Sequence, residues 1–485
     1  MEDFDLQIVA KKSIQGMFAL VSRSFLVQIL AIVSNFVLTI YLDPSMFGIF
    51  FVVSAINVFL AYFQDIGLAA LIIQKKAEPT LKELRTTFTI QQILVLAIVI
   101  PTYLFSTQIA SFFNLSQDGL YVLYAYLVSF VLSSLKTIPT ALLERKLDFH
   151  KLVIPQIAES LVYSLALIYF AVNGYGVATF TYAILLRSII GLPLIYIVQP
   201  WSVGFALNKK LIKELVSKGS PFQGNSILAL VKDDLLNLYV ASALPLTQVG
   251  YIGFAQKWAF MPLRLVMDNV IKVTFPSYSR LQHDPNALRT VVEKSLYLIS
   301  FFIFPIVAAF ITISPKLIEL IPGYAKWEPA LISLMFFSLN ALFASITVPL
   351  TNLLNAIGKV KITLAYMVLW TLLSWILTVF FIQMFGFNGV AVASFVVAAS
   401  VLLILYQVKK EIEFSFIRPI WKQFLAATIM GIAIFIGQEY ISNWYLLALQ
   451  VVFAGIVYMG ILLLISKDEI VKVSKYVKSI VKKNK

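Results

Sequence analysis

Hydrophobic residues run through this chain in long stretches that short polar connections separate. Each stretch is about as long as the ~20 residues that a helix needs to cross a bilayer. The pattern therefore predicts an all-α integral membrane protein with about fourteen transmembrane helices. The predicted spans cover residues 13–40, 46–74, 85–109, 118–142, 150–173, 175–198, 213–244, 247–277, 291–315, 327–355, 361–383, 387–408, 420–438 and 443–466.

The charges in the connections predict the orientation of these spans. If the N-terminus lies inside, the inside connections hold basic clusters such as Lys75-Lys76 and Lys409-Lys410, whereas the outside connections hold only Lys316 and Lys326 as basic residues. Basic loops stay on the cytoplasmic side of a membrane. We therefore expect both termini in the cytoplasm. The acidic N-terminus lacks a cleavage signal, so the first span is expected to remain as an anchor.

The two halves of the chain resemble each other. Asn35 to Gly48 and Asn237 to Gly250 bracket two predicted outer hairpins with the same spacing, at an offset of 202 residues, and the turn at Gly174 is similar to the turn at Gly386. Six spans per copy give two parallel repeats, which predict a central cleft that opens alternately to each side. The expected organisation is an N-terminal six-helix lobe (1–200), a second six-helix lobe (201–410), two further transmembrane helices (411–466) and a basic cytoplasmic tail (467–485).

Composition narrows the class of function. Only 13% of the 485 residues are charged, and the mean hydropathy is +0.89, so no soluble domain remains between the spans. The chain has no cysteine, and its two histidines, His150 and His283, fall in predicted loops. We expect no metal site, no cofactor and no enzymatic activity, because nucleotide-binding and hydrolase motifs are absent from the sequence. The basic residues behind the net charge of +14 lie between the spans and in the tail, which argues against nucleic acid as a partner. The basic tail is expected to be a solvated cytoplasmic helix that fixes the topology, with attraction to anionic lipid as the alternative.

Charged residues within the predicted spans are the main functional signal. A charge at the bilayer centre costs several kcal/mol unless it faces a polar cavity or a partner. A chain that carries ten such charges is expected to have a polar interior and to transport an ionic substrate or use an ion gradient. These residues are Arg23, Asp65, Glu159, Arg187, Lys232, Asp233, Asp234, Lys257, Arg264 and Asp268.

The eighth span has a charged stripe. Lys257, Arg264, Asp268 and Lys272 are separated by 7, 4 and 4 residues, which places them on one face of a helix. Arg264 and Asp268 have the i,i+4 spacing of an ion pair. Lys257 has no local carboxylate, and a bridge to Asp233 or Asp234 of the seventh span is predicted.

Two interpretations of the intramembrane charges stay open. One is an internal salt-bridge network that only holds helices together, which suits Arg23, Lys136 and Lys272 best. The other is an anion site with protonatable or sodium-binding carboxylates nearby. Basic residues predicted for the anion site are Arg23, Arg187, Lys232, Lys257 and Arg264, and the carboxylates that are candidates for ion coupling are Asp65, Glu159, Asp233, Asp234 and Asp268.

Six fragments in order along the chain resemble the Wzx-type oligosaccharide flippases, in the polysaccharide transporter branch of the MOP superfamily. The fragments are YLDPSMFGIF, FQDIGLAALIIQKK, ALLERKLDFHKL, GYGVATFTYAILL, LTQVGYIGFAQK and VTFPSYSRLQHD. The resemblance implies fourteen helices in two lobes. It also implies transport of oligosaccharide repeat units on undecaprenyl pyrophosphate across the cytoplasmic membrane, with basic residues holding the pyrophosphate or acidic sugars. Membrane lipids, a polysaccharide polymerase, other assembly proteins and H⁺ or Na⁺ are the expected partners.

Three other functions remain open at the level of sequence. A lipid II flippase differs from the first interpretation only in its substrate. A drug or cation antiporter of the MATE type should have a net acidic site, whereas the intramembrane charges here are balanced and become basic when Lys136 and Lys272 are added. A membrane polysaccharide polymerase or glycosyltransferase is disfavoured because the longest predicted outer loop, PKLIELIPGYAKWE, offers few catalytic groups.

Overall fold

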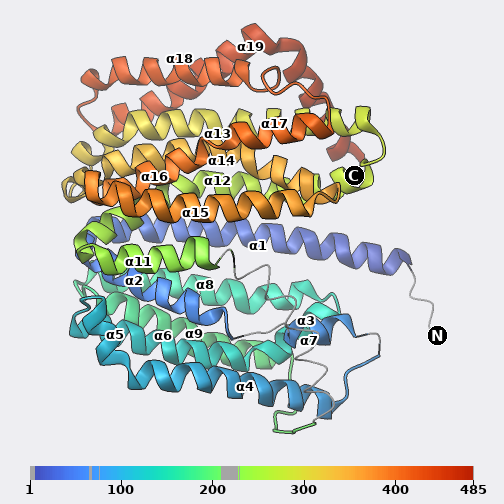
Figure 1. The fold of residues 1–485 in the computed structure, drawn as a ribbon, viewed down its shortest axis with the longest axis vertical. Helices are drawn as coiled ribbons and strands as arrows, with labels where there is room; N and C mark the ends of the chain where they lie inside the picture. Colours follow the sequence, from blue (N-terminus) through green and yellow to red (C-terminus); the bar gives the residue numbers. More distant parts are fainter. Residues whose placement is uncertain (1–5, 65–67, 76, 209–227, 229, 484–485) are drawn as a thin grey trace. The chain divides into compact units, whose positions relative to one another are not determined.

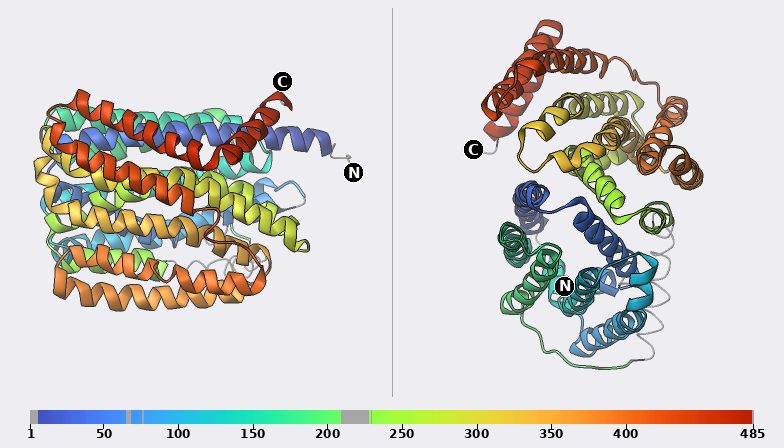
Figure 2. Two further views of the ribbon diagram at one scale, coloured as in Figure 1. Left: turned by 90° about the horizontal axis from the view of Figure 1, so that it is seen from above. Right: turned by 90° about the vertical axis from the view of Figure 1, so that its left-hand side faces the viewer.

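The structure is a computed structural model that describes residues 6–64, 68–75, 77–208, 228 and 230–483. The described residues form helices joined by short connections (Figure 1). The chain divides into two compact units, Met1–Gly253 and Phe254–Lys485. Within each unit most of the long helices run side by side, as Figure 2 shows from two further directions.

Unit 1 contains the following helices in chain order: α1 (Leu6–Tyr41), α2 (Pro44–Ala61), α3 (Leu68–Gln74), α4 (Leu81–Leu104), α5 (Ser106–Phe112), α6 (Gln117–Leu135), α7 (Thr137–Arg145), α8 (Phe149–Val172), α9 (Ala178–Val198), the π-helical turn η1 (Leu230–Asp234), α11 (Leu235–Ala243) and the first residues of α12 (Leu246–Arg280). In this unit α8 contacts both α1 and α9, and α6 contacts α2, α4 and α9.

Local sequence signals set where several of these helices begin. Pro44 is the first residue of α2, where its missing N–H costs no hydrogen bond. At the start of α4, the Thr80 hydroxyl accepts a hydrogen bond from the Glu83 N–H, and the Glu83 carboxylate accepts one from the Thr80 N–H. This reciprocal capping satisfies two backbone donors that a helix start leaves unpaired. At the start of α6 the Ser116 hydroxyl accepts a single hydrogen bond from the Gly119 N–H.

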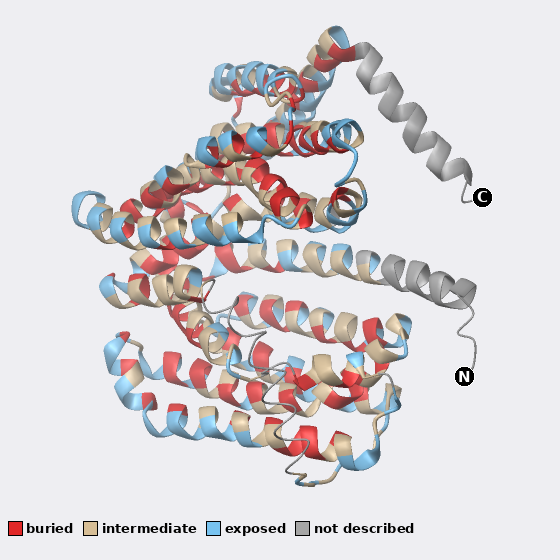
Figure 3. Cartoon of the chain, turned by 45° about the vertical axis from the view of Figure 1, so that its right-hand side comes forward, coloured by how far each residue is buried: buried red, intermediate tan, exposed pale blue. Residues whose placement is uncertain are grey.

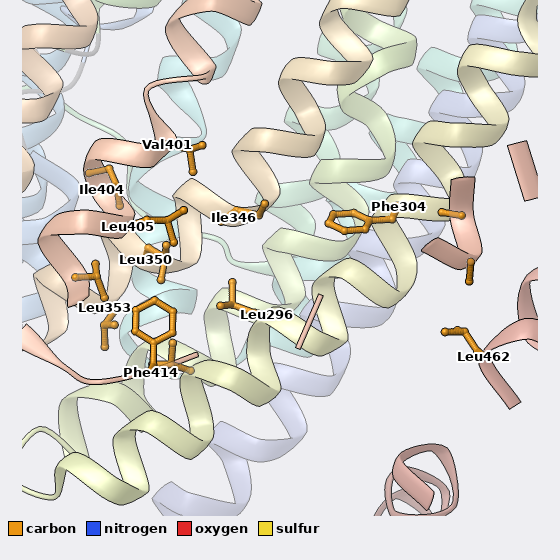
Figure 4. Close-up of a cluster of buried hydrophobic side chains, with 14 of the residues drawn as sticks. Leu296, Phe304, Ile346, Leu350, Leu353, Val401, Ile404, Leu405, Phe414 and Leu462 are labelled. Carbon is orange, nitrogen blue, oxygen red and sulfur yellow. The ribbon is translucent and has the colours of Figure 1, made fainter. Parts of the chain in front are cut away.

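Unit 2 contains the remainder of α12 and the following elements: α13 (Pro285–Leu320), η2 (Ala325–Ala330), α14 (Leu331–Ala356), α15 (Val360–Phe385), α16 (Asn388–Ala398), α17 (Val401–Glu411), α18 (Trp421–Gly437), η3 (Gln438–Tyr440) and α19 (Trp444–Lys483). A core of buried aliphatic and aromatic side chains joins α13, α14, α17, α18 and α19 (Figure 4). Leu296, Leu353 and Ile404 are among its most buried members.

Many large hydrophobic side chains stay exposed. On α15 the exposed residues Leu372, Ile376 and Phe380 follow one another at intervals of four, so they form one apolar stripe. In Figure 3, buried and exposed positions alternate along individual helices. Exposed apolar stripes are stable in hydrocarbon and costly in water. The two-faced helices therefore belong in a membrane.

Eleven helical stretches in the described part of the chain are long and apolar enough to span a membrane. Three predicted spans are not among them. Half of the stretch 213–244 lies outside the described residues, α12 carries the charged stripe, and α18 is only 17 residues long. The multi-pass helical architecture is confirmed, and fourteen crossings in two repeats stay a prediction.

Four predicted spans are each divided into two α-helices in the described part of the chain. These are 46–74 (α2 and α3), 85–109 (α4 and α5), 118–142 (α6 and α7) and 387–408 (α16 and α17). The compact units meet at Gly253, within α12, whereas the sequence predicted a first lobe that ends at residue 200. The two divisions describe different properties, spatial compactness and repetition of sequence, and the lobes predicted from the repeat stay a prediction.

Candidate functional site

A break between α6 and α7 positions the first charged residue of the site. Pro139 follows two residues after the start of α7, and its missing N–H cannot bond to the carbonyl of Leu135, the last residue of α6. The Tyr196 hydroxyl of α9 donates a hydrogen bond to that carbonyl at 3.0 Å. The break is therefore stabilised from a neighbouring helix, and it places Lys136 at the junction of the two helices.

The Lys136 ammonium pairs with a buried carboxylate on another helix. Lys136 Nζ lies 2.8 Å from Glu159 Oε1 of α8. The Glu159 residue is only 8% exposed, so its charge needs a partner inside the protein. The sequence favoured an internal salt bridge as the role of Lys136, and the structure places its charge in an interhelical ion pair.

Arg187 of α9 approaches the same carboxylate from the other side. Arg187 Nε lies 3.7 Å from Glu159 Oε2, within ion-pair distance and beyond a good hydrogen bond. The Arg187 side chain is 49% exposed, whereas the Glu159 side chain is 10% exposed. Lys136, Glu159 and Arg187 therefore form an ion cluster in unit 1 with two cations and one anion.

Aromatic side chains border the exposed cation of this ion cluster. The Arg187 guanidinium lies 5.5 Å from the centroid of the Tyr163 ring, a cation–π distance. Tyr163 stands one turn after Glu159 on α8. The hydroxyls of Tyr126 on α6 and Ser54 on α2 form a hydrogen bond of 2.9 Å. Hydroxyl groups and a guanidinium are suited to hold phosphate or sugar oxygens.

A glycine makes room for the carboxylate. A Cβ atom on Gly191 would lie 2.0 Å from Glu159 Oε1, a distance that no side chain tolerates. Gly191 stands one turn after Arg187 on α9. The α9 backbone can therefore approach Glu159 closely only because this position has no side chain.

Arg23 lies on α1, the other helix that packs against α8. Its Nε atom is buried, with no hydrogen-bond partner among the described residues. No ion pair within 4 Å joins Arg23 to the ion cluster in the described part of the chain. Its predicted place in an anion site stays a prediction, although a buried guanidinium N–H without a partner suits an anionic ligand.

The predicted charged stripe of the eighth span is present on α12. Lys257, Arg264, Asp268 and Lys272 are all exposed. Met267 and Tyr278 of the same helix are buried. The structure thus confirms that the four charges avoid the packed face. No ion pair within 4 Å joins Arg264 and Asp268 in the part of the chain that the structure describes, so the predicted i,i+4 pair is wrong.

The charges of the seventh span form a local pair. Lys232 Nζ lies 3.0 Å from Asp233 Oδ1 within η1, and Asp234 follows at the start of α11. The predicted bridge from Asp233 or Asp234 to Lys257 would join the two units and stays a prediction. Asp65 lies outside the described residues.

The sequence pattern contained signals for the side chains that it did not single out. Tyr163 follows Glu159 by four residues, and Gly191 follows Arg187 by four. Both spacings place the second residue on the same helix face as the first. The pairing of Lys136 with Glu159 has no such signal, because the two residues are 23 positions apart and meet only when α6 and α7 pack near α8.

Comparison with known proteins identifies the family. Residues 37–332, more than half of the chain, match the family model described as polysaccharide biosynthesis protein. The chain belongs to this family.

Its relatives include an uncharacterised membrane protein in the cps region of Klebsiella pneumoniae, 24% identical, and the lipopolysaccharide biosynthesis protein WzxC of Escherichia coli K12, 23% identical. The matched region covers 71% of this chain in both cases, and 71% and 70% of the respective relatives. The succinoglycan biosynthesis transport protein ExoT of Rhizobium meliloti is 23% identical over half of the chain and 49% of its own length.

Solved structures share the fold of this family member. The lipid II flippase MurJ, in an inward closed conformation, matches with a TM-score of 0.77 and 19% identity, over 93% of this chain and 99% of its own. An inward-facing MATE multidrug resistance transporter of the MOP superfamily matches with a TM-score of 0.61 and 15% identity, over 81% and 98%. The chain is therefore a multi-pass helical membrane protein with the fold of these transporters.

Proposed function

We propose that this protein is a flippase that moves undecaprenyl-pyrophosphate-linked oligosaccharide repeat units across the cytoplasmic membrane for cell-surface polysaccharide biosynthesis. Membership of the polysaccharide biosynthesis family supports the pathway, and the names of its relatives WzxC and ExoT support transport as its step. The fold that it shares with MurJ suits movement of a lipid-linked substrate. We propose a transporter rather than an enzyme, with both termini in the cytoplasm.

The ion cluster is the observation that carries this proposal. Two cations share one carboxylate, so the ion cluster has an excess positive charge, and its exposed member is Arg187. A pyrophosphate is a dianion or more at neutral pH, and a guanidinium matches its oxygens in a bidentate geometry. We propose that Arg187 binds the pyrophosphate, with Arg23, Lys232, Lys257 and Arg264 as further basic contacts along its path.

Energy for the cycle is proposed to come from an H⁺ or Na⁺ gradient. The carboxylates proposed for coupling are Asp65, Glu159, Asp233, Asp234 and Asp268. Among the described members of this set, Asp233 and Asp268 are exposed, whereas Glu159 is buried. Passing the translocated unit to a polysaccharide polymerase and other assembly proteins completes the proposed role.

A reconstituted flip assay tests the function. Purified protein in liposomes receives a fluorescent undecaprenyl-pyrophosphate oligosaccharide, and an external quencher reports its arrival in the outer leaflet, with and without an H⁺ or Na⁺ gradient. We expect protein-dependent translocation that is faster with the gradient. Translocation of lipid II at an equal rate would move the assignment to a lipid II flippase. Uptake of a small organic cation without lipid movement would move it to a drug antiporter.

The same assay tests the basic residues. Arg187→Ala and Lys257→Ala should each slow translocation about 10- to 100-fold, the equivalent of the ~1.5–3 kcal/mol that a hydrogen bond to a charged group contributes. Lys410→Ala, the same charge change at the end of α17, is the matched control and should keep the rate of the unchanged protein. Normal rates in the first two variants would refute the anion site and leave the salt-bridge interpretation.

A further inference from the structure

The two ion pairs of Glu159 differ in strength. Lys136 Nζ is 2.8 Å from one carboxylate oxygen, and its side chain is 16% exposed. Arg187 Nε is 3.7 Å from the other oxygen, and its side chain is 49% exposed. A short buried ion pair holds its members in place, whereas a long and exposed one is weakened by solvent. Glu159 therefore has one fixed cation and one that can leave.

The charge balance also makes Arg187 the exchangeable partner. Lys136 alone neutralises the carboxylate, so departure of Arg187 does not leave a buried charge unpaired. The Tyr163 ring gives the Arg187 guanidinium a second contact besides the Glu159 carboxylate. An anionic ligand that reaches Arg187 competes with the Glu159 carboxylate for one guanidinium, and the missing side chain of Gly191 leaves room for that carboxylate beside α9.

We propose that Glu159 is the internal anion with which the phosphate of the substrate exchanges for Arg187. This inference rests on the proposed function and adds a role for Glu159 in the binding and release of the headgroup, which needs no coupling ion. In the empty protein Glu159 holds Arg187 in place, and when the headgroup leaves, Glu159 takes Arg187 back. Lys136 is a positioning residue, because it holds the carboxylate while Arg187 is engaged elsewhere.

The exchange predicts binding changes of opposite sign. Glu159→Gln removes the competing anion at nearly the same shape, so an anionic ligand should bind about tenfold more tightly. Lys136→Met leaves Arg187 as the one remaining ion-pair partner of the buried carboxylate within the ion cluster, so the ligand should bind about tenfold more weakly. In the double variant no carboxylate of the ion cluster competes for Arg187. Lys136→Met should therefore change the affinity for the ligand little in the Glu159→Gln background.

The experiment is a double-mutant cycle on the full chain in lipid nanodiscs, with inorganic pyrophosphate as the probe and calorimetry as the measurement. A non-additive double variant supports exchange, since charges that act only through space give additive effects. Glu144→Gln on α7 makes the same charge change without an ion pair within 4 Å among the described residues, and it should alter the affinity much less. Melting temperatures of all variants show whether they fold.

The rate of flipping is a second measurement that separates exchange from a merely structural ion pair. Loss of a merely structural pair would not combine slower flipping with tighter binding. Glu159→Gln should flip the lipid-linked substrate more slowly although it binds pyrophosphate more tightly, because the headgroup is released less readily. Additive affinities, or weaker binding in Glu159→Gln, overturn the exchange. If the variants give either of these two results but the unchanged protein flips its substrate, the flippase assignment stands and only the exchange is lost. If the unchanged protein does not flip, the proposed function itself is lost.

Discussion

At the scale of single residues, the ion cluster depends on one missing side chain. Gly191 lets the α9 backbone lie against the Glu159 carboxylate, and a Cβ atom there would also approach Glu159 Cδ to 2.3 Å. Helical glycine normally destabilises, by ~1 kcal/mol relative to alanine. Its presence in the middle of a long helix is thus explained by packing against the ion cluster and not by helix preference.

Gly191→Ala should therefore disturb the ion cluster. The new methyl group forces Glu159 away from its place between Lys136 and Arg187, and overpacking of this kind costs ~1–3 kcal/mol. We expect a lower melting temperature in detergent and a slower flip rate. Gly455→Ala on α19 is the control, because nothing lies within 4 Å of its would-be Cβ, and it should be neutral or slightly stabilising. Equal stability and normal transport in both variants would contradict the packing role of Gly191.

At the scale of helices, a close crossing joins the starts of α2 and α12. A Cβ on Gly48 would lie 1.8 Å from the Leu246 carbonyl oxygen, and a Cβ on Gly250 would lie 1.8 Å from that of Pro44. The contact is reciprocal, and the 202-residue offset of the predicted repeat relates Pro44 to Leu246 and Gly48 to Gly250. Small residues allow membrane helices to approach this closely. The reciprocity is what two related hairpins packed about a pseudo-twofold axis would produce, and it supports the proposed duplication.

Gly48→Ala and Gly250→Ala should each destabilise the crossing strongly. The added methyl group meets backbone atoms, which cannot rotate away as a side chain can. The two helices must therefore move apart, which should lower the free energy of unfolding by ~3 kcal/mol or more. Because the contact is reciprocal, the two variants should lower the melting temperature by similar amounts. Gly460→Ala, with open space around its Cβ, serves as the reference. A loss in only one of the two variants would argue against a reciprocal contact.

The charged stripe of α12 makes this helix less hydrophobic than a typical membrane-spanning helix. Its exposed charges lower the hydropathy of a 35-residue helix that is otherwise long enough to cross the bilayer. Helical periodicity placed Lys257, Arg264 and Asp268 on one face, and all three residues are exposed in the structure. A membrane helix with such a face is expected to border a polar path rather than lipid.

At the scale of the whole molecule, the orientation in the membrane decides the direction of transport. The connections that hold most of the basic residues should face the cytoplasm. Because the chain has no cysteine, single introduced cysteines report accessibility without a background. Gln117 and His283 are exposed residues on connections that are predicted to lie on opposite sides.

Gln117→Cys should react with an impermeant maleimide in intact cells, whereas His283→Cys should react only after the membrane is permeabilised. Both variants change exposed residues near the ends of helices, so both should keep the flip rate of the unchanged protein. The reverse labelling pattern would invert the proposed topology, and with it the direction assigned to the flippase.

The sequence by itself determined the class of the protein, the approximate position of its helices and the single charged face of α12. These features follow from hydropathy and from the 3.6-residue period, which act over short distances along the chain. Tertiary structure decided which charges meet. Lys136 and Arg187 reach Glu159 from 23 and 28 residues away. Their pairing depends on the proline break before α7, on the Tyr196 hydroxyl that donates to the Leu135 carbonyl at the break, and on Gly191 allowing close approach. Contacts of this kind arise only when helices pack, so no local pattern contains them.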